Sequence, residues 1–402
     1  MGIIVKKFGG SSVANVDRMK AVAKIIAKTK DQGHQCVVVV SAMGDHTDEL
    51  IDLAHQISAH PSSRELDMLM TTGEQVSISL LAMTLQEMGY RAISLTGWQA
   101  GIETEEVYGK ARITNIDTKR ILHELEKDQI VIVAGFQGIS NQEITTLGRG
   151  GSDTSAVALA AALHADVCEI YTDVEGVYTT DPRVVKNAKK LNEISYDEML
   201  ELANLGAVVL HPRSVENAKH HRVKLVVRSS FVDTPGTEIK EEKSMENVRV
   251  VTGVAYDLDV TRVQVVDLEN KIDALADLFT TLANENINVD MIVTSDYEKD
   301  RINVSFSISD QDIGPTLKVL EKKLGEQAKV SHDHHLAKVS IVGAGMISNP
   351  GVAAKMFKIL SDAGIPIHMV TTSEIKVSCL VPKTQAKQAV QVLHDAFELG
   401  QE

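Results

Sequence analysis

The sequence is poor in several residue classes, and each shortage excludes a class of protein. Only 4% of its 402 residues are aromatic, and it has three cysteines, Cys36, Cys168 and Cys379. Three cysteines cannot build a disulfide framework, and because each lies in or beside a β-branched run we expect buried, reduced thiols. No apolar run approaches the about 18 residues that a membrane span requires. The N-terminal residues contain neither an apolar h-region nor a cleavage site, so we expect no secretory signal.

Positive charge is also scarce. The chain has 41 Lys and Arg against 55 Asp and Glu, a formal net charge of −14. Nucleic acids and anionic membranes attract clustered positive charge, and with no long basic stretch we expect neither as a partner. These features together predict a soluble, cytoplasmic protein.

The length is enough for two or three domains at roughly 150 residues each. The first 230 or so residues alternate short apolar runs with helical patterns. Strands are expected at 3–5, 36–40, 92–95, 130–134, 168–171 and 223–227, and helices at 16–29, 64–87, 153–164 and 196–204. Continuous apolar runs are typical of strands covered on both faces. The pattern predicts an α/β sandwich on a largely parallel sheet.

The chain changes character after these elements. Residues 233–246 combine turn chemistry with charged residues, which predicts a linker. Beyond the linker the sequence repeats itself, because Ile287–Ser295 matches Ile365–Ser373 at a constant offset. Each repeat is too small to bury a core well alone, so we expect the two to pack edge to edge.

Two glycine-rich turns are candidates for anion binding. Lys7-Phe8-Gly9-Gly10 follows the first strand, and paired glycines allow backbone N–H groups to approach an anion. An ordinary strand-to-helix turn explains two glycines equally well. The second turn, Leu147–Ser155, adds Arg149, whose guanidinium can hold a carboxylate. Two such turns on one sheet favour a ligand site, although Ser152 or Asp153 could be a plain helix cap.

Two further polar clusters are weaker signals. Thr172–Arg183 follows the strand at 168–171, and ligands usually bind at strand ends of an α/β sheet, although a solvated loop would look similar. Thr71–Gln75 interrupts an otherwise helical run. Glu74 there could bind a cationic group, although a surface carboxylate is the default interpretation.

Other motifs are absent or incomplete. The chain has no Walker-A motif, which excludes a P-loop NTPase. Val339–Gly345 lacks the third glycine of a dinucleotide fingerprint. Ser331–His335 lies between the repeats, where a solvated linker is a better interpretation than a metal site.

Five motifs together closely resemble the aspartokinases of the amino-acid kinase superfamily. They are KFGGSSV (7–13), TTGEQ (71–75), TTLGRGGSDTSA (145–156), YTDVEGVYTTDPR (171–183) and SEIKVS (373–378), and the likeness extends over essentially the whole chain. The resemblance implies an amino-acid kinase α/β/α sandwich at 1–235, a linker at 236–250, and two C-terminal βαββαβ ACT domains at 251–330 and 331–402. The end at Glu402 is similar to monofunctional members rather than to those fused to homoserine dehydrogenase. In length and in the sequences of its motifs, the chain looks most similar to the lysine-inhibited aspartokinases of Gram-positive bacteria.

The resemblance implies that ATP, with Mg²⁺, phosphorylates the side-chain carboxylate of L-aspartate to 4-phospho-L-aspartate. This step opens the route to lysine and diaminopimelate, methionine and threonine. Such a protein mainly positions two anions and neutralises their charge. In the catalytic roles, Lys7 would stabilise the transferring phosphoryl group and Asp153 would orient Lys7. No protein side chain is assigned as a metal ligand.

The resemblance also implies the binding residues. Glu74 would bind the α-ammonium of aspartate and Arg149 its α-carboxylate. The remaining substrate-binding residues would be Ser41, Thr47, Gly150, Gly151 and Ser152, and the nucleotide would be bound by Lys7, Phe8, Gly9, Gly10, Thr172, Asp173, Tyr178, Asp181 and Arg183. The chain departs from some relatives at Val208, where they carry a lysine near the phosphates. Whatever that lysine contributes must come from elsewhere, and Arg183 and Arg213 are two candidates.

The paired ACT domains imply feedback control by L-lysine, alone or with L-threonine. Effector-binding residues would be Asn288, Val289 and Asp290 in the first repeat, with Met346, Ser348 and Asn349 closing the site from the second. Asp290 would meet the effector's ammonium, and His368 at the corresponding place would make the two sites unequal. The assembly would be a homo-oligomer, or an α2β2 form whose ACT-only subunit starts at Met245.

Two alternatives remain open. One is a catalytically silent amino-acid sensor with a relic kinase half. The other is a related kinase acting on glutamate, acetylglutamate, carbamate or UMP. Glu74 with Arg149 favours an amino acid with both α-groups free, which disfavours acetylglutamate and UMP.

Overall fold

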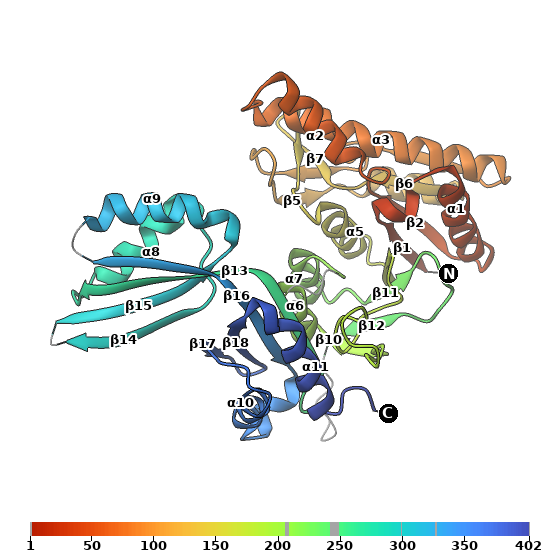
Figure 1. Ribbon diagram of the computed structural model, residues 1–402. Coiled ribbons are helices and arrows are strands. Elements are labelled where there is room, and N and C mark those ends of the chain that lie inside the picture. Colours follow the sequence, from red (N-terminus) through yellow and green to blue (C-terminus); the bar gives the residue numbers. More distant parts are fainter. Residues whose placement is uncertain (1, 206–208, 242–248, 299, 326–327, 402) are drawn as a thin grey trace. The chain divides into compact units, whose positions relative to one another are not determined.

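A computed structural model describes residues 2–205, 209–241, 249–298, 300–325 and 328–401. Contacts divide these residues into two units (Figure 1). The first takes its residues from Met1–Val177, Lys190–Asn204 and Val208–Ser244, and the second from Tyr178–Lys189, Leu205–Ala207 and Met245–Glu402. No helix in the described ranges is long and apolar enough to cross a membrane.

The first unit is built on an eight-stranded sheet with the order β10-β12-β11-β9-β1-β2-β6-β3. Its strands are β1 (Ile3–Phe8), β2 (Gln35–Val40), β3 (Ala92–Leu95), β6 (Ile130–Ala134), β9 (Val167–Thr172), β10 (Glu193–Ser195), β11 (Leu225–Ser229) and β12 (Thr237–Lys240). Every pairing of the described strands in this sheet is parallel except β11 with β12. The prediction of a largely parallel α/β sheet is therefore confirmed.

Helices cover both faces of this sheet. The helices of this unit are α1 (Val16–Asp31), α2 (His46–Ile57), α3 (Ser63–Glu87), α4 (Lys119–Glu126), α5 (Gly151–Ala162), α6 (Tyr196–Asn204) and α7 (Pro212–His221). Val38 and Val40 of β2 pack in one core with α1 and α3. Because successive side chains of a strand alternate between faces, Val39 points to the opposite layer. There a Cβ placed on Gly135 would lie 2.9 Å from Val39 Cγ1 and 2.8 Å from Ser152 of α5.

A small four-stranded sheet accompanies the main one and was not predicted. Its order is β5-β4-β7-β8, formed by β4 (Ile102–Thr104), β5 (Ile113–Ile116), β7 (Gln137–Ser140) and β8 (Glu143–Thr146). These strands are three or four residues long and contain polar side chains. Such segments carry little of the apolar signal that identifies a buried strand.

The second unit contains one six-stranded sheet, in the order β14-β15-β13-β16-β18-β17. Its strands are β13 (Gly253–Glu269), β14 (Ile292–Glu298), β15 (Arg301–Ile308), β16 (Lys329–Val342), β17 (Met369–Thr372) and β18 (Lys376–Pro382), and its helices are α8 (Ala274–Asn284), α9 (Ile313–Leu324), α10 (Val352–Asp362) and α11 (Ala386–Ala396). The long strands β13 and β16 pair antiparallel at the centre. The two repeats thus lie edge to edge, and each has its own core.

Three local predictions are wrong. The segment Thr237–Lys240 of the expected linker is β12, in which Thr237 and Ile239 are fully buried. Thr71–Gln75 does not interrupt a helix, because α3 continues through it. Ser331–His335 belongs to β16 rather than to a solvated linker.

The structure also shows where the cysteines and the polar segment at 178–189 lie. All three cysteines are buried and free, as predicted. Met245 and Val208 lie outside the described residues. Residues Tyr178–Lys189 pack in the second unit, where the backbone N–H of Val254 donates to the carbonyl of Thr179 over 2.8 Å.

Candidate active site

The carboxyl ends of three neighbouring parallel strands form the site. Phe8 at the end of β1 lies opposite Val40 of β2 and Tyr171 of β9. The backbone N–H of Ser41 donates to Phe8 O over 3.1 Å, which holds the two chain exits together. A crevice at the carboxyl ends of parallel strands is the usual ligand position in open α/β sheets.

The first glycine turn is tightly packed against the loop after β2. The N–H of Gly44 donates to the carbonyl of Gly10 over 3.1 Å. A Cβ on Gly10 would lie 2.8 Å from the carbonyl oxygen of Gly44, a contact that side chains do not make. Gly9 donates its N–H to the carbonyl of Tyr171 at a long 3.4 Å. Position 10 therefore requires glycine, because the backbones of Gly10 and Gly44 approach each other closely.

The second glycine turn leads into α5 and brings an acid beside Lys7. Gly150 has a φ of +66°, and a Cβ there would lie 2.2 Å from His211. Asp153 in the first turn of α5 pairs with Lys7, with 2.6 Å between Oδ1 and Nζ and both side chains 12% exposed. A carboxylate is favourable at a helix N-terminus, and the free N–H groups there attract anions.

Glu74 is buried, so its interpretation as a surface carboxylate is wrong. It lies in α3 with 2% of its surface exposed, and its Oε1 accepts a 3.1 Å hydrogen bond from the backbone N–H of Ala42. Among the described residues its Oε2 has no hydrogen-bond partner. Burial raises the pKa of Glu74 from 4.5 to about 7. A buried carboxylate with one unused oxygen suits a cationic ligand group.

The glycine before Glu74 explains how the helix reaches the site. A Cβ on Gly73 would lie 2.8 Å from Cβ of Ala42, so a larger residue would separate α3 from the loop after β2. Close packing at Gly73 allows Glu74 to reach the backbone of Ala42. The motif TTGEQ is thus a contact point in a continuous helix rather than a helix break.

The other predicted substrate residues surround these groups. Ser41 follows β2 and Thr47 lies in the first turn of α2, both half-buried. Arg149 lies in the second glycine turn, is exposed, and has no ion-pair partner within the described part of the chain. Gly151 and Ser152 begin α5.

Two residues brace the second glycine turn, a role that the sequence did not predict for either of them. Arg213 donates to the carbonyls of Leu147 over 2.7 Å and of Ala111 over 3.1 Å, so two of its five N–H groups brace the turn. Asp67, fully buried in α3, accepts from the backbone N–H of Thr146 over 2.8 Å and from its hydroxyl over 2.8 Å. An isolated acid on the apolar face of a predicted helix was the available signal for Asp67.

The residues predicted to bind the nucleotide divide between the two units. Lys7, Phe8, Gly9, Gly10, Thr172 and Asp173 belong to the first unit, and Tyr178, Asp181 and Arg183 to the second. Thr172 donates its hydroxyl to Asp173 Oδ1 over 3.0 Å. Arg183 pairs with Asp181 at 3.0 Å.

The predicted effector residues lie on the two repeats of the second unit. Asp290 Oδ2 is 2.6 Å from Nζ of Lys338, whose side chain is 8% exposed on β16. Asn288 is exposed and Val289 half-buried beside it. Met346, Ser348 and Asn349 lie in or directly after the short 3-10 helix η4 (Ala344–Ser348), where Asn349 donates its side-chain amide to the carbonyl of Gly345 over 2.8 Å. Within the described ranges, no hydrogen bond or ion pair joins the two groups.

The described side chains do not gather into a metal-binding cluster. No group of three or more His, Cys, Asp and Glu side chains among them could hold a metal ion. In β16 the ring of His334 stacks on that of His332 at 6.2 Å and lies tilted by 43° against that of His335 at 4.1 Å.

Comparisons with known proteins agree with this geometry. The amino acid kinase family matches residues 2–229, and the ACT domain matches 266–324 and 339–397. Aspartokinase from Geobacillus stearothermophilus is 59% identical over 403 residues, covering 100% of this chain and 98% of that protein. Aspartokinase 2 from Bacillus subtilis strain 168 is 58% identical with the same coverage.

Solved structures extend the likeness to three dimensions. Escherichia coli aspartokinase III in complex with aspartate and ADP superposes with a TM-score of 0.83 at 30% identity, covering 98% of this chain and 99% of that one. The same enzyme with lysine and aspartate gives 0.77 at 29% identity and the same coverage. The chain therefore belongs to the amino acid kinase family and, within it, to the aspartokinases.

Proposed function

We propose that this chain transfers the γ-phosphoryl group of ATP to the side-chain carboxylate of L-aspartate, giving 4-phospho-L-aspartate for lysine, diaminopimelate, methionine and threonine synthesis. The observation that carries the proposal is the buried Glu74, which is held by the backbone N–H of Ala42 just after β2 and keeps its other oxygen without a partner among the described residues, while Lys7 at the end of the neighbouring β1 pairs with Asp153 of α5. An acid for an ammonium and a lysine for a phosphate are the groups that this pair of substrates needs.

Aspartate would be oriented by its two α-groups. Glu74 would accept the α-ammonium, and Arg149, free of other ion pairs among the described residues, would hold the α-carboxylate in bidentate fashion. Ser41, Thr47, Gly150, Gly151 and Ser152 would complete the pocket. The β-carboxylate is then the group left to face the nucleotide.

The transfer would be an in-line displacement. An ionised β-carboxylate oxygen forms a bond to the γ-phosphorus while the bond to the β–γ bridging oxygen breaks, and ADP leaves as an anion. No proton has to move, so the protein acts by positioning and by charge. Lys7 would neutralise the moving phosphoryl group, and its 2.6 Å contact with Asp153 would fix its direction.

The nucleotide would be bound by backbone N–H groups of Gly9 and Gly10 and by Phe8, Thr172 and Asp173. Tyr178, Asp181 and Arg183 are the further nucleotide-binding residues that the aspartokinase motif implies. In the described ranges the chain has no cluster of acids for a metal of its own. Such a site fits a Mg²⁺ ion that is bound mainly by nucleotide phosphates and water, with one carboxylate such as Asp173. When bound, the ion would offset phosphate charge.

We further propose that L-lysine, alone or with L-threonine, inhibits the enzyme through the ACT repeats. Asp290 would receive the effector's ammonium, with Asn288 and Val289 beside it and Met346, Ser348 and Asn349 closing the site. The ammonium of Lys338 already lies 2.6 Å from Asp290, so the carboxylate has a geometry that suits such a group.

In Asp290→Asn we expect inhibition by lysine to weaken at least tenfold, with aspartate turnover unchanged when lysine is absent. Inhibition equal to that of the unaltered protein would remove Asp290 from the effector site.

The assembly is proposed as a homo-oligomer, or as an α2β2 form with an ACT-only subunit that begins at Met245. Intact mass spectrometry of protein expressed from the native gene distinguishes the two. A single full-length species contradicts the two-subunit form.

The test of the proposed reaction is ADP release by purified protein with Mg²⁺ and ATP, using L-aspartate and then L-glutamate, each with and without L-lysine. Turnover that requires aspartate supports the proposal, and turnover that prefers glutamate assigns a different amino-acid kinase. Lys7→Ala should abolish turnover while lysine binding persists. Lysine binding without turnover in the unaltered protein would instead indicate an amino-acid sensor.

A further inference from the structure

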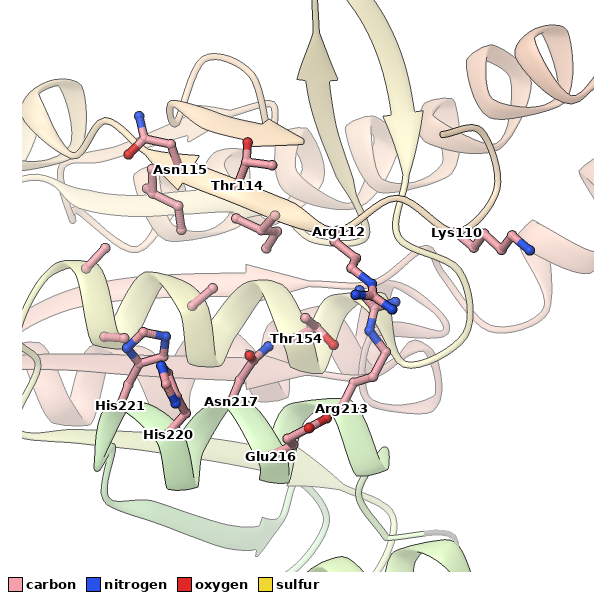
Figure 2. A pocket seen from close by; sticks show the side chains of 15 residues that line it. Lys110, Arg112, Thr114, Asn115, Thr154, Arg213, Glu216, Asn217, His220 and His221 are labelled. Carbon is pink, nitrogen blue, oxygen red and sulfur yellow. The ribbon is translucent and has the colours of Figure 1, made fainter. Parts of the chain in front are cut away.

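The first unit has a second groove that shares no residue with the proposed aspartate and nucleotide sites. It lies among β5, α5 and α7 and has a volume of about 770 Å³ (Figure 2). Pockets of this size hold small organic ligands. Nothing in the proposed reaction uses it.

The groove is basic in an acidic protein. The chain as a whole has a net charge of −14, yet this groove is lined by Lys110, Arg112, Arg213 and two histidines against one carboxylate, Glu216. A local excess of cations attracts anions even when the net charge has the opposite sign.

Two arginines concentrate this charge at one end. Arg213 is half-buried and fixed by the carbonyls of Leu147 and Ala111, which take one N–H of each terminal nitrogen and leave its positive charge and its other N–H groups in place. Burial, and then the positive charge of Arg112, lower the pKa of Arg213. Arg112 also pairs with Glu105, with 3.7 Å between Nε and Oε1. Because the Arg112 side chain is 82% exposed, this pairing is weak. Glu105 and Glu216 offset part of the repulsion between the two arginines, and a bound dianion would offset it further.

The rest of the groove suits an uncharged, partly apolar body. Ala158, Ala161 and Ala162 of α5 form its floor. Thr154 and Asn217 line the space between the two helices and offer hydrogen bonds (Figure 2). Along α7, His220 lies about 10 Å from Arg213 at about 1.5 Å per residue, so the groove is longer than a phosphate ion.

We propose that this groove binds a small organic phosphate. A phosphomonoester dianion would lie between Arg112 and Arg213, since guanidinium groups hold phosphate oxygens through paired N–H donors. The organic part would cover the alanine floor and extend toward His220 and His221.

The floor alanines are direct reporters of occupancy. We would record methyl NMR spectra of the full chain carrying labelled alanine, with aspartate present, and titrate AMP and then inorganic phosphate. The expected result is saturable movement of the Ala158, Ala161 and Ala162 signals, with AMP binding tighter than inorganic phosphate.

Two variants test the assignment independently. Arg112→Glu changes an exposed side chain and should weaken AMP binding roughly tenfold or more. Ala158→Leu fills the floor and should weaken AMP more than inorganic phosphate. Lys24→Glu, the same charge change at an exposed position on α1, is the matched control and should leave binding unchanged. Absent or non-saturable shifts, equal affinity for AMP and inorganic phosphate, or binding unaffected by Arg112→Glu would each overturn the proposal.

Discussion

Glu74 should release a proton when aspartate binds. Its pKa in the empty site is raised by burial from 4.5 to about 7. At about 1.4 kcal/mol for each pKa unit, ionising this buried carboxyl costs about 3 kcal/mol more than in water. An ammonium beside the free Oε2 would restore the charged form, because an opposite charge at hydrogen-bonding distance offsets desolvation.

The magnitude follows from the same pKa. At pH 7 about half of the Glu74 side chains are protonated, so binding should release about 0.5 proton per aspartate, against about 0.9 at pH 6 and about 0.1 at pH 8. Because aspartate requires the ionised form, its apparent affinity should be about tenfold higher at pH 8 than at pH 6. The folded protein without ligand should change in the opposite sense: the raised pKa stabilises it at low pH, and this contribution is lost as pH rises through 7.

Isothermal titration calorimetry measures the release directly, when aspartate binding is compared in buffers with different ionisation enthalpies. Glu74→Gln removes the titrating group and should abolish both the release and the pH dependence, while weakening binding. Glu87→Gln, exposed on the same helix, is the control and should behave as the unaltered protein. If the unaltered protein releases no proton at pH 7, or if Glu74→Gln releases as many, then Glu74 does not meet the ammonium.

Three further changes follow from contacts in the structure. Gly73→Ala should cost about 1–3 kcal/mol of unfolding free energy and reduce aspartate kcat/KM, because its Cβ would lie 2.8 Å from Ala42. The control, Gly314→Ala, has no atom within 4 Å of the new Cβ and should cost nothing. Urea unfolding and steady-state kinetics compare the two variants. Lys6→Met removes the buried ammonium beside Glu169, which keeps Arg228 at 3.0 Å and the Tyr171 hydroxyl at 3.1 Å, so urea unfolding should show a loss of about 1–3 kcal/mol of unfolding free energy. No measurable loss would mean that Arg228 and Tyr171 compensate the carboxylate fully. Burial lowers the pKa of His394, so the folded state binds fewer protons than the unfolded state, and the unfolding free energy should fall as pH falls below about 6.5. His394→Gln should flatten the dependence of unfolding free energy on pH between about 7.5 and 5.5. An unchanged dependence would assign it to other groups.

The sequence was most informative where one physical requirement dominates. The central strands were predictable because covered strands need continuous apolar runs, as in the fully buried Val37–Val40. The glycine turns were predictable because only glycine allows the approach of backbones seen at Gly10. In both cases, a short stretch of residues carries the whole signal.

Prediction failed where the controlling contact is distant in sequence. Glu74 looked like a surface acid because nothing nearby reveals that Gly73 packs against Ala42, some thirty positions earlier. The strand β12 looked like linker because its alternation of buried Thr237 and Ile239 with two half-exposed charges is only four residues long. Tertiary packing decides both, and a local pattern cannot report it.

The two ACT repeats show how small sequence differences make similar halves unequal. Lys338 on β16 corresponds in the repeat to Arg262 on β13, and Asp290 corresponds to His368. Lys338 of the second repeat pairs with Asp290 of the first, whereas Arg262 pairs instead with Asp333, at 3.7 Å. A histidine at position 368 cannot supply the carboxylate that an ammonium needs. If Asp290 is the effector's partner, as proposed, only the first repeat can bind an ammonium in this way, and each chain should therefore bind one lysine at such a position rather than two.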